Sequence, residues 1–247
     1  MRVLVDSHVH LHEIREYSRY CNRAGMVLLA VSDDLKSSEL TLSRFRGCRN
    51  VVPAVGIHPW EVGGSSEGEL RRVLELAEGA PFIGEVGLDR RFVSGTYGKQ
   101  LRFFREFVDY ASSKGKGMSI HAAGAWREVL EVLKSSGVRA AVIHWYTGPR
   151  ELIEDIESMG YFIGVNAAIK VQRKMVEVVK HAPLEVMLTE SDAPYEYRGV
   201  RLMPELVPEV ISAIARVKGV DEDVVASTIF GNFRRLLGLV GIDLSIS

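Results

Sequence analysis

Eight short runs rich in valine and isoleucine recur along the 247-residue chain, and longer segments with apolar residues at helical spacing separate them. This alternation is typical of parallel strands joined by crossover helices. Eight such units predict an α/β fold, a (β/α)8 TIM barrel, and the chain length suits one barrel. The predicted strands are residues 3–6, 26–31, 51–55, 81–84, 117–121, 139–144, 161–165 and 185–190.

The segments between the strands predict helices over residues 13–24, 67–78, 99–114, 126–133, 150–159 and 170–181. Two more helical segments, 204–217 and 221–237, follow the last strand, which is one helix more than the eightfold repeat needs. We expect this extra C-terminal helix to pack across the outside or the bottom of the barrel. None of the glycine- and serine-rich turns is long enough for a linker, so residues 1–247 are predicted to form a single domain.

Charge and apolar patterning limit the partners of the chain. Lys and Arg total 31 against 32 for Asp and Glu, so any contact with nucleic acid should be local. Asp6 comes too early for a signal peptide, and the chain has no apolar run of about 18 residues. We therefore expect a cytoplasmic protein without membrane contact, and no obligate protein partner is evident. Cys21 and Cys48 form no metal-type pair and are predicted to be reduced thiols.

Histidines and carboxylates gather where the predicted strands end, which is where TIM barrels carry their chemistry. His8 and His10 are separated by one residue, so both side chains project from the same face of the first strand. One histidine near a strand end is usually an ordinary polar residue, but coincidence at four strand ends is hard to explain in that way. The residues at predicted strand ends are His8, His10, His58, Glu85, His121, His144 and Asp192.

The residue types at these positions favour metal-dependent hydrolysis. Imidazoles mixed with carboxylates, without thiolates, suit two divalent ions of the zinc, manganese or nickel kind. Two such ions can share a hydroxide and hold both sides of a scissile centre. His58 precedes a proline and is predicted to support the site or to face substrate. His12 and His181 are expected to have no role in catalysis, since one lies beyond its strand and the other at a helix end.

Six motifs in the same order resemble those of the TatD family of metal-dependent deoxyribonucleases, and the resemblance covers nearly the whole chain. The tail of the chain, residues 229–237, also resembles the closing helix of that family. The motifs are D-S-H-V-H at 6–10, G-I-H-P at 56–59, G-E-V-G-L-D at 84–89, I-H at 120–121, I-H-W-Y-T-G at 143–148 and T-E-S-D-A-P at 189–194.

The resemblance implies a phosphodiesterase of the amidohydrolase superfamily with two metal ions. It assigns His8, His10, Glu85 and Asp192 to one ion and Glu85, His121 and His144 to the other, so that Glu85 bridges them. It also implies that Asp192 orients the attacking water and takes its proton.

Departures from the family pattern concern the substrate more than the metal ions. The family commonly has an arginine two residues after the fifth-strand histidine, where this chain has Ala123, so a phosphate clamp is missing there. Arg90 stands where family members often have an aromatic residue. We predict substrate contacts from His58, Arg90 and Trp145, although the arginine and the tryptophan are equally well explained as ordinary rim residues.

Three functions therefore remain open from the sequence. The first is hydrolysis of phosphodiesters in DNA ends or small nucleotides. The second is hydrolysis of a small amide, lactone or phosphate ester by a related enzyme. The third is a metal-binding scaffold without catalytic activity, which the missing arginine suggests and the six retained metal positions oppose.

Overall fold

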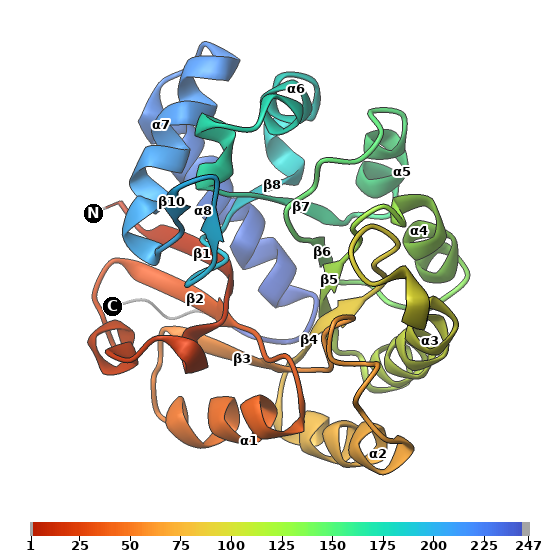
Figure 1. The fold of residues 1–247 in the computed structure, drawn as a ribbon. Helices are drawn as coiled ribbons and strands as arrows, with labels where there is room; N and C mark the ends of the chain where they lie inside the picture. Colours follow the sequence, from red (N-terminus) through yellow and green to blue (C-terminus); the bar gives the residue numbers. More distant parts are fainter. Residues whose placement is uncertain (1, 244–247) are drawn as a thin grey trace.

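The computed structural model describes residues 2–243 and arranges eight parallel strands in chain order in one sheet, which curls into a ring (Figure 1). The predicted (β/α)8 fold is confirmed. The predicted domain covers residues 1–247, of which Met1 and residues 244–247 lie outside the described part. The strands are β1 (Leu4–Val9), β2 (Met26–Ala30), β3 (Val51–Val55), β4 (Phe82–Gly87), β5 (Gly117–His121), β6 (Ala141–Ile143), β7 (Phe162–Val165) and β8 (Met187–Thr189).

Side-chain and backbone hydrogen bonds bring the first and last strands together. The Thr189 hydroxyl donates to the Val5 carbonyl at 2.6 Å, and the Ser191 amide donates to the Asp6 carboxylate at 2.8 Å. Beyond the strand end, the Asp192 amide donates to the His8 carbonyl at 2.9 Å. These contacts place the chain after β8 directly beside the two histidines of β1.

Helices surround the ring and cover its apolar outer face. The helices that follow β2 to β7 are α1 (Leu35–Arg44), α2 (Glu67–Leu76), α3 (Tyr97–Lys114), α4 (Trp126–Lys134), α5 (Leu152–Ser158) and α6 (Arg173–His181). Capping boxes fix where two of them begin, at Asp34 for α1 and at Ser66 for α2, because each side chain accepts a hydrogen bond from the backbone three residues on.

Two helices follow β8, α7 (Val207–Lys218) and α8 (Glu222–Gly238), as predicted. The α8 helix lies behind the ring in Figure 1. Its Asn232 amide donates to the carbonyls of Leu184 and Met187 at 2.9 and 2.8 Å, at the N-terminal end of β8. The extra helix thus packs at the end of the barrel opposite the histidines. A short hairpin of β9 (Glu196–Tyr197) and β10 (Val200–Arg201) comes between β8 and α7.

Between β1 and β3 the structure differs from the prediction. The helix predicted over residues 13–24 is replaced by two 3-10 turns, Leu11–Glu13 and Tyr17–Tyr20. The side-chain amide of Asn50 donates to the carbonyls of Tyr20 and Met26, at 2.9 and 3.0 Å, and so links the end of this loop to the start of β2. The helix α1 was not predicted, because its buried side chains, Ser37, Ser38 and Thr41, carry no apolar signal.

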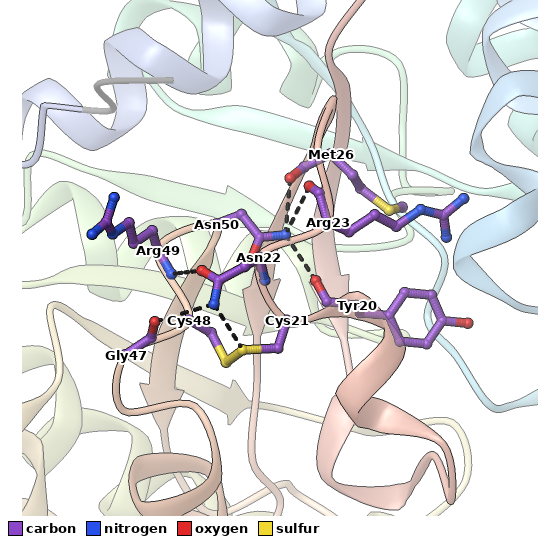
Figure 2. The surroundings of a disulfide bond; sticks show 9 residues. All are labelled: Tyr20, Cys21, Asn22, Arg23, Met26, Gly47, Cys48, Arg49 and Asn50. Carbon is purple, nitrogen blue, oxygen red and sulfur yellow. Dashed lines mark hydrogen bonds between the residues drawn. A yellow bond between two sulfur atoms is a disulfide. The ribbon is translucent and has the colours of Figure 1, made fainter. Parts of the chain in front are cut away.

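The prediction of reduced cysteines is wrong in this structure, because Cys21 and Cys48 form a disulfide (Figure 2). The two residues are 27 apart in sequence, and the fold brings their Cα atoms to 4.9 Å. Asn22, next to the bridge, accepts a hydrogen bond from the Arg49 amide at 2.9 Å. The bridge joins the loop after β1 to the loop before β3, and spacing alone could not reveal this contact.

We expect the disulfide to contribute about 3 to 4 kcal/mol to the free energy of unfolding, because it closes a loop of this length in the unfolded chain. The double variant Cys21→Ser, Cys48→Ser should unfold at a correspondingly lower denaturant concentration. Wild type in reductant should match the variant. Equal midpoints for oxidised wild type and the variant would contradict the prediction.

No helix within residues 2–243 combines the length and the apolar character needed to cross a bilayer.

Candidate metal centre

All six residues assigned to metal binding converge at the C-terminal ends of the strands. His8 lies on β1, Glu85 lies on β4, and His10 comes directly after β1. His121 ends β5, His144 follows β6, and Asp192 lies after β8. Their side chains are at most 14% exposed. Residues distant in sequence thus form one buried cluster.

Four atoms of this cluster lie close together, with five separations between 3.1 and 3.5 Å. His8 Nε2 lies 3.3 Å from His10 Nε2 and 3.1 Å from Glu85 Oε2. His10 Nε2 lies 3.3 Å from the same oxygen. Asp192 Oδ1 lies 3.5 Å from His8 Nε2 and 3.4 Å from His10 Nε2. A tetrahedron with metal–ligand bonds of about 2.0–2.1 Å has edges of about 3.3 Å, and these five distances lie close to that value. The four side chains are therefore candidates to hold one ion together.

A second group of three atoms adjoins the other oxygen of Glu85. Glu85 Oε1 lies 2.9 Å from His121 Nδ1 and 3.0 Å from His144 Nε2. The two histidine nitrogens are 3.3 Å apart. Three ligand atoms leave a position open, as is usual in catalytic zinc sites. Because Glu85 offers one oxygen to each group, the geometry fits a carboxylate bridge between two ions.

Outer hydrogen bonds set the direction of two histidine lone pairs. His10 Nδ1 lies 2.9 Å from a carboxylate oxygen of Asp33, and His121 Nε2 lies 3.0 Å from one of Asp89. A carboxylate accepts hydrogen bonds, so each of these nitrogens carries the proton. In the neutral rings the other nitrogen then turns a lone pair toward Glu85. Lone pairs facing carboxylate oxygens fit a cation between them, and carboxylate–histidine pairs commonly orient metal ligands.

His58 differs from these ligands. Its Nδ1 accepts a hydrogen bond from the Trp60 amide at 3.1 Å, so in the neutral ring Nε2 carries the proton. That nitrogen lies 3.2 Å from Glu85 Oε1. His58 is therefore placed to donate a hydrogen bond into the cluster instead of offering a lone pair to an ion.

Charge within the cluster keeps its two carboxylates ionised. Burial would raise the pKa of Glu85, but the neighbouring histidines outweigh it and hold the pKa well below its usual range. Burial likewise opposes ionisation of Asp192, yet His10 and the other nearby histidines lower its pKa when they are protonated. Burial lowers the pKa of His8, which favours the neutral imidazole that metal binding needs. At His10, His121 and His144 the neighbouring carboxylates outweigh burial and raise the pKa, so a bound ion would displace protons from these three imidazoles.

Three carboxylates around the cluster were not predicted as site residues. Asp33 follows β2 and contacts His10, while Asp89 contacts His121. Burial opposes ionisation of Asp89, but hydrogen bonds from His121, the Phe92 amide and the Trp60 indole lower its pKa to about 2. Glu190, fully buried, lies 3.8 Å from His144 Nδ1. Asp89 and Glu190 lie within the motifs at 84–89 and 189–194, which could have marked them as site residues. For Asp33 the available signal was its position two residues after the second predicted strand.

His12 and His181, which were predicted to have no role in catalysis, lie in different parts of the molecule. His12 lines the cavity above the cluster, with Nε2 3.2 Å from Asp33 Oδ2 and Nδ1 3.2 Å from the Val31 carbonyl. It thus lies closer to the site than its position beyond the strand suggested. His181 lies in the last turn of α6, as predicted, and its Nδ1 is 2.7 Å from the Glu177 carbonyl.

The predicted substrate contacts are only partly brought together. A cavity of about 820 Å³ lies above the cluster, and His58 and Trp145 line it. Arg90 is not among the lining residues, because its guanidinium pairs with Glu128 and lies over the Tyr97 ring. The next residue, Arg91, lines the cavity instead.

Comparison with known proteins decides the family. A model of the family described as TatD related DNase matches residues 5–238. The chain belongs to the TatD family. Its curated TatD relatives include two called uncharacterized metal-dependent hydrolases, YcfH of Escherichia coli K12 and TatD of Mycobacterium tuberculosis. Each is 27% identical to this chain; the alignments cover 94% and 96% of this chain and 95% and 98% of the relatives.

A solved structure agrees with the TatD assignment at the level of the fold. The crystal structure of YjjV, a TatD homologue from Escherichia coli, superposes with a TM-score of 0.85 at 21% identity, over 94% of this chain and 97% of that chain. Metal-dependent hydrolase is thus the broad class to which the family assigns this protein.

Proposed function

We propose that this protein hydrolyses phosphodiester bonds in nucleic-acid ends or small nucleotides with the help of two divalent metal ions. The observation that carries the proposal is the Glu85 carboxylate, which gives one oxygen to each of two adjoining ligand groups. The family match supports the choice of substrate, as does a relative from Vairimorpha ceranae named as a putative deoxyribonuclease, 30% identical over 61% of this chain.

His8, His10, Glu85 and Asp192 would hold one ion, and Glu85, His121 and His144 the other. The ions, when bound, would act as Lewis acids and would lower the pKa of water at the centre. Zinc, manganese and nickel all suit this mixture of nitrogen and oxygen ligands.

The side chains of the protein would then position and deprotonate the nucleophile. Asp192 lines the cavity. Its backbone lies in the left-handed region at a φ of 57°, and its amide donates a hydrogen bond to the His8 carbonyl. Strained residues of this kind are typical of functional sites. Its carboxylate would take the proton of the attacking water as the new oxygen–phosphorus bond forms. That proton would pass to the leaving oxygen as the bond from phosphorus to that oxygen breaks.

His58 would contribute a hydrogen bond. Its Nε2–H points at Glu85, so it can hold the bridging carboxylate in place or donate to a substrate oxygen nearby. Either contact would position groups without any proton being transferred from His58.

The alternative function, hydrolysis of a small amide, lactone or phosphate monoester, would use the same centre. A panel of substrates distinguishes it from phosphodiester hydrolysis. We expect protein supplemented with manganese or zinc to shorten end-labelled single-stranded DNA, and a chelator to abolish the reaction. The position of the retained label gives the polarity of digestion. Cleavage of amides or lactones while all phosphodiesters stay intact would favour the alternative.

A further inference from the structure

Aromatic side chains line the cavity on two opposite sides. Trp60 and Phe92, which follow β3 and β4, form one pair with ring centroids 6.0 Å apart. Trp145 follows β6 and Tyr195 follows β8, and their ring centroids are also 6.0 Å apart. Tyr197 on β9 packs 5.1 Å from Trp145. In the strand order of the ring, β3 and β4 lie across from the stretch β6 to β8, so the segments that carry the two groups come from opposite parts of the ring.

The exposure of these rings is unusual for the molecule. Trp60, Phe92 and Tyr195 are 43%, 63% and 46% exposed. Of the large hydrophobic side chains that are exposed within residues 2–243, these three are the aromatic ones, and all three line this cavity. Contiguous exposed apolar surface is typical of a binding site.

Both tryptophans are tied to residues that contact the metal-binding histidines. The Trp60 indole donates to Asp89 at 2.7 Å, and Asp89 contacts His121. The Trp145 amide donates to Glu190 at 2.8 Å, and its indole donates to Gln172 at 2.9 Å. The two tryptophans are therefore held at fixed positions beside the proposed metal centre, which limits the entropy lost when a ring binds against them or their partners.

Charge along the cavity leaves few contacts for a phosphate backbone. Lys36 and Arg91 are the lysine and arginine side chains among the described lining residues. Acids that are not proposed metal ligands outnumber them, namely Glu13, Asp33, Asp34, Glu61 and Glu196. Affinity for a nucleotide must then come largely from its rings and from the metal centre.

We infer that the two aromatic groups bind one planar ring on each side of the scissile bond, so that the enzyme selects an unstacked dinucleotide unit. This inference rests on the proposed phosphodiesterase function. The rings within each pair are nearly perpendicular, at 74° for Trp60 and Phe92 and 79° for Trp145 and Tyr195, so one ring of each pair is available to stack on a base. Phe92 stacks on one base and Tyr195 on the other, and each tryptophan supports its partner by an edge-to-face contact.

The test uses four dinucleotides, thymidylyl-thymidine and its three analogues in which one or both bases are replaced by the base-free tetrahydrofuran sugar. Wild type should lose about tenfold in kcat/KM for each base removed, since stacking on aromatic side chains contributes roughly this much per base. Phe92→Ala and Tyr195→Ala should each cause a similar loss with the full dinucleotide. Each variant should also become insensitive to removal of one base, and the two variants to different bases.

Phe92→Leu keeps apolar volume without a flat ring and should behave like Phe92→Ala. Val224→Ala is the matched control, because Val224 is 48% exposed on α8 and lies outside the cavity lining. If base removal costs the variants as much as it costs wild type, the stacking inference is wrong.

Calorimetry measures binding of the bases independently of cleavage, so that ring binding and the proposed function are tested separately. The four compounds are titrated into the metal-loaded protein, and Kd should rise about tenfold for each base removed. If no compound is cleaved but this series is seen, the phosphodiesterase proposal fails and ring binding stands. Equal Kd values for all four compounds would overturn ring binding, whether or not the compounds are cleaved.

Discussion

Glu85→Gln should reduce metal binding from two ions per chain to at most one at micromolar metal. The substitution keeps the size of the side chain but removes the negative charge that Glu85 contributes to both ligand groups. Loss of an outer contact to a metal ligand already costs about 10- to 100-fold in affinity. We therefore expect a loss of at least about 100-fold here, with activity falling in parallel.

Metal analysis of the purified variant and thermal unfolding with added metal measure this effect. At 100 times its Kd, an ion should raise the free energy of unfolding of wild type by about 2.7 kcal/mol, and much less in the variant. Glu61→Gln is the matched control, since it also lines the cavity and its carboxylate has no hydrogen bond to another described residue. Two ions bound to Glu85→Gln with wild-type affinity would rule out the bridging role.

The barrel could be predicted because its signal repeats. Each β-run is short and apolar, and a predicted helical segment follows every run except the second, so errors at single elements do not change the fold class. Between β1 and β3 the prediction was wrong for two reasons. The buried face of α1 consists of hydroxyl side chains, and the preceding loop is fixed by Asn50 and by the disulfide. Contacts between residues far apart in sequence decided that region, and no periodicity reports them.

The inner part of the site could be predicted for a similar reason, and the outer part could not. Parallel strands bring their C-terminal ends together, so histidines at several strand ends must meet. Asp33 has no such signature, because it stands beside Asp34, which caps α1, and two acids before a helix are ordinary. Likewise, Arg90 and Arg91 are adjacent in sequence, and only the turn after β4 decides which of them reaches the cavity.

Asp192→Asn should lower kcat by about 1,000-fold at saturating metal while the protein still binds two ions. Asparagine keeps an oxygen that can ligate an ion in place of Asp192 Oδ1, which lies 3.5 Å from His8 Nε2 and 3.4 Å from His10 Nε2. Its amide cannot take a proton from water, and a positioned general base contributes about 100- to 10,000-fold to the rate. The result is read from initial rates on labelled single-stranded DNA, together with metal content.

Glu196→Gln provides the control for Asp192→Asn, because Glu196 is an exposed acid at the same cavity and is not a ligand. It should retain a rate within about threefold of wild type. If Asp192→Asn binds two ions and its kcat also stays within about threefold of wild type, Asp192 is a ligand and not the base. The proton acceptor would then have to be sought among the other acids that line the cavity, with Asp33 and Glu13 the first to replace, because both lie beside His12 at its wall.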